Sequence, residues 1–62
     1  MKYELYTVRD TVTEQCSNPF LAETDKAAIR AFEKDRHNQP FPDDFELYLV
    51  GSFESSTGVV TP

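Results

Sequence analysis

The hexapeptide YELYTV at residues 3–8 is nearly repeated as FELYLV at residues 45–50. Both copies are rich in aromatic and branched side chains, and each has the length of a single β-strand. Each copy also places apolar groups on both of its alternating faces. Because one helix covers only one face of a small sheet, apolar residues on the other face predict a second covering surface, most simply another protein chain.

The only convincing helix lies between the two copies. Thr24 is a good N-cap, Asp25 follows it in the first turn, and Asn38 with Pro40 supplies a stop signal. These signals predict a helix at residues 25–37. Its apolar side consists of Ala28, Ile29, Ala31 and Phe32.

The remaining segments predict short strands and turns. Residues 19–22 form an apolar island that begins with proline, and one interpretation is a short edge strand. A hairpin return at residues 11–15 is a second open interpretation. Residues 55–58 predict a hairpin turn, since Gly58 can adopt a positive φ, and residues 59–61 return as the last strand. We therefore predict an α+β fold, with one helix packed on a small, mostly antiparallel sheet in the order β-α-β-β, with or without an extra strand before the helix.

Chain length limits how stable the protein can be alone. We interpret residues 1–62 as a single domain. A chain of this size buries only about 60% of its unfolded surface, so its stability is marginal. Cys16 is the only cysteine, which excludes an internal disulfide, and no Cys/His cluster is present to bind zinc. Oligomerisation remains as a source of stability, and we expect a homodimer or a higher oligomer.

The second sheet face, or an exposed sheet edge, is the expected oligomer interface. Alternation places Tyr6 and Val8 on one face of the first strand. In the second strand it separates Phe45, Leu47, Leu49, Gly51 and Phe53 from Glu46, Tyr48, Val50 and Ser52. We predict that Tyr6, Tyr48 and Val50 form the interface, on the face opposite the helix.

Charge and hydropathy restrict the partners. The chain has 11 acidic and 6 basic residues, for a net charge of −5, and such a field disfavours a free-standing DNA binder. The sequence shows no basic leader followed by an apolar stretch, and no apolar run approaches the roughly 20 residues that span a bilayer. We expect a soluble, unprocessed chain without a membrane partner, in a reducing cytoplasm.

Three basic residues recur at four-residue spacing on the polar side of the helix, namely Lys26, Arg30 and Lys34. Like charges at this spacing cost a few tenths of a kcal/mol per pair in an isolated helix. One interpretation of this basic row is a contact with phosphates or with an acidic partner. The other is a solvated face that Glu23, Glu33 and the acidic strands balance.

Few residues suit catalysis or metal binding. His37 is the only histidine and suits the negative end of the helix as a surface residue. Cys16 has no basic neighbour in the sequence to activate its thiol. Asp43 and Asp44 lack the spacing and the glycine of a calcium loop. We expect no catalytic residue, no cofactor and no metal; an enzyme would need a cleft where His37 meets one of these aspartates.

Four stretches follow a known pattern in the same order: residues 2–10, 19–22, 25–32 and 42–53. The most specific is Pro-acid-acid-Phe-x-Leu-Tyr at residues 42–48, followed by Gly-x-Phe and then Thr57-Gly58. With these stretches, the chain resembles the small nonstructural protein family of gokushoviruses, which are single-stranded DNA microviruses.

This resemblance implies a function. Members of that family are absent from the capsid and are thought to assist viral DNA synthesis or the switch from replication to packaging. The resemblance implies a non-enzymatic phage accessory protein in the host cytoplasm, and together with the acidic balance it favours contact with a viral or host replication or packaging protein. The alternative is a single-stranded DNA-binding protein that uses the basic row on an oligomer.

Overall fold

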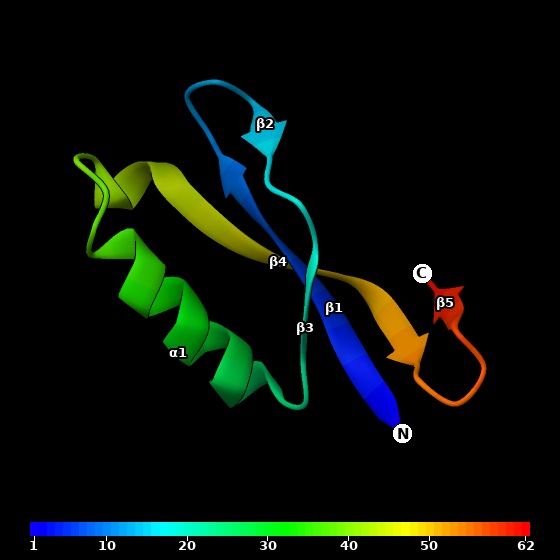
Figure 1. Ribbon diagram of the computed structural model, residues 1–62. Coiled ribbons are helices and arrows are strands. Elements are labelled where there is room, and N and C mark those ends of the chain that lie inside the picture. The colour runs from blue at the N-terminus through cyan, green and yellow to red at the C-terminus, as the bar shows by residue number, and fades with distance from the viewer.

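The computed structural model describes residues 1–62 and contains one α-helix and five short or long strands (Figure 1). The elements are β1 (Lys2–Asp10), β2 (Gln15–Cys16), β3 (Phe20–Ala22), α1 (Asp25–Arg36), a 3₁₀ turn (Pro42–Asp44), β4 (Phe45–Glu54) and β5 (Val59–Thr61). The prediction of one helix on a mostly antiparallel sheet is confirmed in outline. The number and order of strands differ from the predicted pattern, which had at most two strands before the helix, because three strands precede it.

The sheet is built around the long antiparallel pair of β1 and β4. β4 pairs with β1 from Lys2 to Asp10. The opposite edge of β1 pairs with β2 at one end and with β3 further along, and β5 pairs with the last residues of β4. The strand order is therefore β2-β1-β4-β5, with β3 beside β1. The two repeated hexapeptides lie side by side in this pair.

The helix forms where its sequence signals predict it. The side chain of Thr24 accepts a hydrogen bond from the backbone N–H of Ala27, at 3.1 Å, and caps the first turn. The helix ends at Arg36, with His37 as the C-cap, one residue earlier than predicted. Of the predicted apolar side, Ala28 and Phe32 are buried, while Ile29 remains 50% exposed.

A bulge in β4 changes which residues share a face. Tyr6 lies opposite Leu49, but the preceding Leu5 lies opposite Gly51, so Val50 is an extra residue without a partner. The extra residue reverses the alternation along β4. The prediction that alternate residues from Phe45 to Phe53 share one face is therefore wrong beyond Leu49.

The core lies between α1 and the face of the sheet that carries Tyr6. The ring of Tyr6 is 3% exposed and stacks on Phe20 with 5.8 Å between ring centroids. Its hydroxyl donates a hydrogen bond to Asp25 in the first turn of α1, which raises the pKa of Tyr6 to about 12. The prediction that Tyr6 lies opposite the helix is wrong, because the helix docks on this face of β1.

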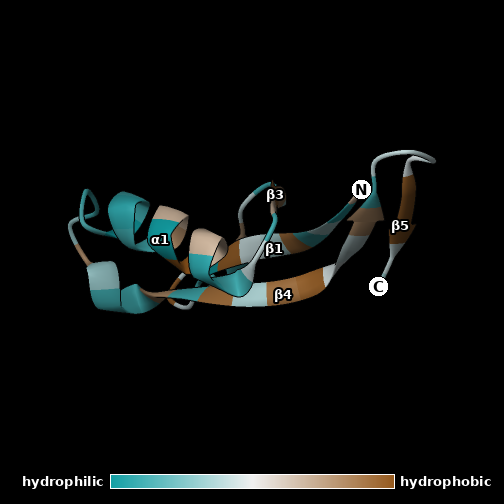
Figure 2. Cartoon of the chain, turned by 90° about the horizontal axis from the view of Figure 1, so that it is seen from below, coloured by the Kyte–Doolittle hydropathy of each residue, from teal (hydrophilic) through white to brown (hydrophobic).

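The molecule is long and thin. Its extents are 38 × 21 × 12 Å, and its radius of gyration is 12.4 Å, against roughly 10.5 Å for a compact chain of this length. Its accessible surface is 4632 Å², against about 4,100 Å² for a typical monomer of this mass. Figure 2 shows the reason: α1 covers one side of the β1–β4 pair, and no element covers the other.

Candidate functional site

The side of the sheet away from α1 carries a set of mostly apolar side chains. Residues that lie opposite one another in neighbouring strands point to the same face. The pairings place Leu21 beside Leu5, place Tyr3 beside Phe53 and Val60, and place Thr7 beside Tyr48. We call these side chains the open face: Tyr3, Leu5, Thr7, Leu21, Tyr48, Phe53 and Val60.

Exposure varies across the open face. Leu21, Tyr48 and Val60 are 46%, 42% and 55% exposed. Tyr3, Leu5 and Phe53 are half-buried, and Thr7 is buried, at 7% exposed. A contiguous apolar patch of this kind on a small protein is typical of an interaction surface.

The hydroxyl groups of Thr7 and Tyr48 on the open face have hydrogen-bond partners within the chain. The Thr7 hydroxyl donates to the backbone carbonyl of Ser17, at 2.7 Å. The Tyr48 hydroxyl donates to Oε1 of Glu46, at 2.9 Å, and this bond raises the pKa of Tyr48. Arg9 lies opposite Glu46 in the sheet. The face therefore offers apolar contact and no cluster of reactive groups.

The three predicted interface residues do not lie together. Tyr48 lies on the open face, whereas Tyr6 is buried under α1. Val50 occupies the bulge, is 43% exposed and lines a hollow with Glu4 and Ser52, whose side chains belong to the helix side. The sequence prediction missed the other six members of the open face, which are Tyr3, Leu5, Thr7, Leu21, Phe53 and Val60. The alternation within residues 3–8 already places Tyr3, Leu5 and Thr7 on one face. The other three residues join this face through the pairing of distant strands, which no local sequence signal predicts.

The basic row is exposed to solvent. Lys26, Arg30 and Lys34 all lie on the outer side of α1. None of them takes part in the ion pairs of the structure. Glu33, expected to balance the row, lies 2.9 Å from the guanidinium of Arg36 instead. Glu33 therefore makes no ion pair with the basic row.

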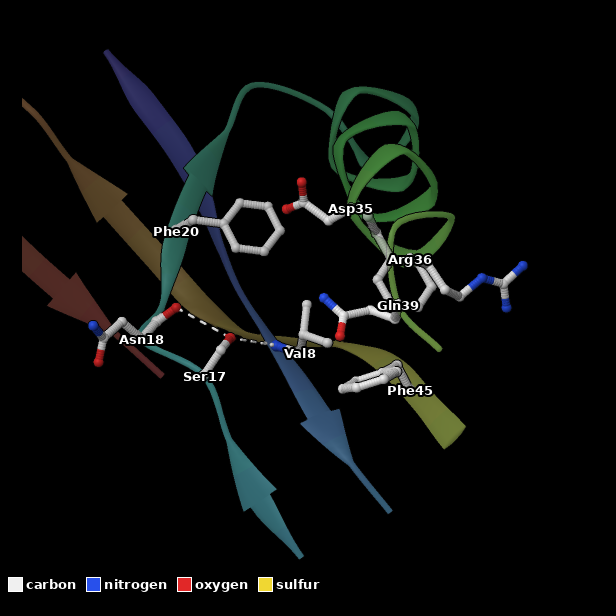
Figure 3. Close-up of a pocket in the computed structure, with 9 residues that line it drawn as sticks. Val8, Ser17, Asn18, Phe20, Asp35, Arg36, Gln39 and Phe45 are labelled. Atoms are coloured by element: carbon white, nitrogen blue, oxygen red, sulfur yellow. Dashed lines mark hydrogen bonds between the residues drawn. The ribbon is translucent and has the colours of Figure 1, made fainter. Parts of the chain in front are cut away.

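A cavity of about 490 Å³ opens between the end of α1 and the sheet (Figure 3). Its apolar lining is Val8, Phe20, Phe32 and Phe45. Asp35 and Gln39 also line it, and the guanidinium of Arg36 lies 5.4 Å from the centroid of the Phe32 ring. The cavity leaves part of the small core accessible to solvent.

Comparison with known proteins places the chain in a family. The family model described as Phage ORF5 protein matches residues 3–62. The chain belongs to this family. No curated protein sequence and no solved structure is significantly similar to it. The match includes β1, α1 and β4, so the open face and the basic row both lie in the part of the chain that this Phage ORF5 family member shares with its family.

The other candidate residues of the Phage ORF5 family member are dispersed. The side chain of His37 is 76% exposed, and its Nε2 lies 3.8 Å from a carboxylate oxygen of Glu33. Cys16 is an exposed free thiol in β2. Asp44 accepts hydrogen bonds from Thr11 through its backbone carbonyl. No group of three potential metal ligands is present, and α1 is too short and too polar to cross a bilayer.

Proposed function

We propose that this Phage ORF5 family member is a non-enzymatic accessory protein of the gokushovirus type. It assists viral single-stranded DNA synthesis, or the switch from replication to packaging, by binding another protein in the host cytoplasm. The motif at residues 42–48 supports the gokushovirus assignment. The open face is the observation that carries the proposal, because an uncovered apolar surface on so thin a molecule favours a protein partner.

Charge narrows the class of partner. The chain carries a net charge of −5, and proteins that handle single-stranded DNA are positively charged where they meet phosphates. Opposite net charges accelerate association, while apolar contact at the interface slows dissociation. The partner proposed is therefore a basic viral or host protein of replication or packaging.

The proposal is tested in phage that carry a double variant of the open face, Leu21→Lys and Val60→Lys. Both residues are exposed, so we expect the chain to keep its fold, while the lysines add charge to the apolar surface and repel a basic partner. We expect infected cells to make less single-stranded genome relative to the double-stranded replicative form. Val12→Lys, at a residue that is 71% exposed in the β1–β2 turn, is the control for added lysine away from the open face.

An unchanged ratio in the double variant contradicts the proposal. So does an equal loss in the Val12→Lys control, because that result reflects added charge and not the open face. Circular dichroism of the purified variants checks that the double variant keeps its secondary structure.

The alternative function is binding of single-stranded DNA through the basic row. Its support is that three exposed cations on one helix face lack carboxylate partners. The test is fluorescence anisotropy of a labelled single-stranded oligonucleotide at low and at physiological salt. Salt-sensitive binding that the triple change Lys26→Glu, Arg30→Glu and Lys34→Glu abolishes, but Lys2→Glu preserves, supports this alternative. Absence of binding at low salt excludes it.

A further inference from the structure

One edge of the sheet lacks a partner strand over much of its length. β4 pairs with β1 along one side, but on its other side β5 covers only the residues from Ser52 to Glu54. Gly51 lies against the backbone of Thr61 and Pro62, so the backbone of residues 45–50 is the part that has no neighbouring strand on that side. We call this stretch the free edge. Figure 1 shows this part of β4 running from the 3₁₀ turn toward β5, with β1 as its only neighbouring strand.

The other outer edges carry features that block pairing. β2 and β3 are two and three residues long, and the segment between them contains Pro19. β5 is three residues long and is followed by Pro62, which has no backbone N–H to donate. The free edge contains neither proline nor lysine, the residues that commonly protect edge strands. Its only charged residue, Glu46, accepts a hydrogen bond from Tyr48.

An apolar hollow lies beside the free edge. It has a volume of about 370 Å³ and is formed by α1 and β4, with Ile29 and Phe32 on the helix and Leu47 and Leu49 on the strand. Ile29 and Leu49 are 50% and 58% exposed. An added strand that supplies side chains at alternate positions would fill such a hollow while its backbone pairs with β4.

We propose that the free edge binds the free edge of a second copy of this chain, antiparallel and about a twofold axis near Tyr48. Leu47 of one protomer then lies opposite Leu49 of its partner, next to the hollow. Glu46 lies near the bulge at the partner's Val50 and not opposite the partner's Glu46, which avoids a like-charge pair. A twofold contact requires a self-complementary patch, and an antiparallel strand edge is one.

The accessible surface area of the chain is large enough for a second copy to bind. The chain exposes roughly 500 Å² more than a typical monomer of its mass, and a stable dimer buries at least about 500 Å² on each partner. Pairing at this edge joins two sheets into one. Because paired residues point to the same face, the open faces of both protomers lie on the same side and remain accessible.

The test is sedimentation equilibrium of the full chain at micromolar concentration. We expect twice the chain mass of 7.1 kDa. Leu49→Lys should raise the dimer dissociation constant roughly thirtyfold or more, as expected for a central interface residue. The matched control is Val59→Lys on β5, whose residue is equally exposed at 56% and should leave the constant within about threefold.

Hydrogen exchange supplies a second measurement that does not depend on a variant. Outward-facing amides of residues 45–50 have no strand partner within the chain, so they should exchange more slowly as protein concentration rises. A wild-type monomer at micromolar concentration overturns the proposal. A dimer that Val59→Lys disrupts and Leu49→Lys does not also overturns it. Either result leaves the phage test of the open face unaffected, because that test uses other residues.

Discussion

At the scale of single residues, a few polar contacts join segments that are distant in the sequence. Oε1 of Glu54 receives hydrogen bonds from the N-terminal amino group of Met1 and from the backbone and side chain of Ser56. These contacts hold the pKa of Glu54 at about 2, below the ordinary value of 4.5. The start of β1 is thus tied to the end of β4 by one carboxylate.

The first prediction concerns Glu54→Gln. Because the pKa of Glu54 is lower in the folded chain, its ionised form stabilises the fold fully above about pH 4.5 and loses this effect as pH falls toward 2. We expect the wild type to lose more stability over this range than Glu54→Gln does. Urea unfolding as a function of pH measures the difference. Glu23→Gln, at an exposed residue outside the ion pairs, should show the acid loss of the wild type.

At the scale of elements, the junction of β4 and β5 depends on glycine. A Cβ on Gly51 would lie 2.6 Å from the carbonyl oxygen of Thr61, so β5 can approach β4 only where this side chain is absent. Gly58 adopts a φ of 75° in the connecting turn, which favours glycine. The position of the short strand β5 therefore depends on these two glycines, and few side chains pack against it.

The second prediction concerns Gly51→Ala. The added methyl group must push β5 away from β4, so amides of Val59–Thr61 should exchange faster, by roughly tenfold or more if the displacement costs about 1–3 kcal/mol. Hydrogen exchange followed by nuclear magnetic resonance measures the change. Ser52→Ala is the control at the next residue. Equal protection of β5 in Gly51→Ala and the wild type would contradict the prediction.

The sequence predicted the helix and the short strand β3, but it did not predict the bulge in β4. The cap at Thr24 and the stop after His37 are local signals, and the observed helix follows them within one residue. The island at residues 19–22 forms the edge strand β3, which was one open interpretation. The bulge at Val50 was not predicted, because it depends on how two strands far apart in the chain match their lengths.

At the scale of the whole molecule, the core is too small to give much stability. Only 4 of 62 residues are buried, and a core in so small a domain rarely supplies more than about 3–5 kcal/mol. Each buried side chain therefore accounts for a large share of the total. A dimer would add stability that depends on protein concentration.

The third prediction concerns Phe32→Ala. Phe32 is 9% exposed between α1 and the sheet, and removal of such a ring costs about 3–5 kcal/mol. We expect the variant to be largely unfolded at room temperature. Circular dichroism with thermal melting measures the effect. Val12→Ala, at an exposed turn residue, should change stability by less than about 0.5 kcal/mol, and a cooperative melt of Phe32→Ala like that of the wild type would refute the prediction.

The two long strands and the capped helix between them follow from local sequence patterns, because each depends on residues within a few positions of one another, and the acidic charge follows from the composition. Only the tertiary structure decided which face of β1 the helix covers, since both faces carry apolar groups. It placed Tyr6 in the core and Tyr48 on the open face. It also decided the register that puts Val50 in a bulge and leaves the free edge unpaired. Such features arise from long-range pairing, in which a single extra residue reverses a face.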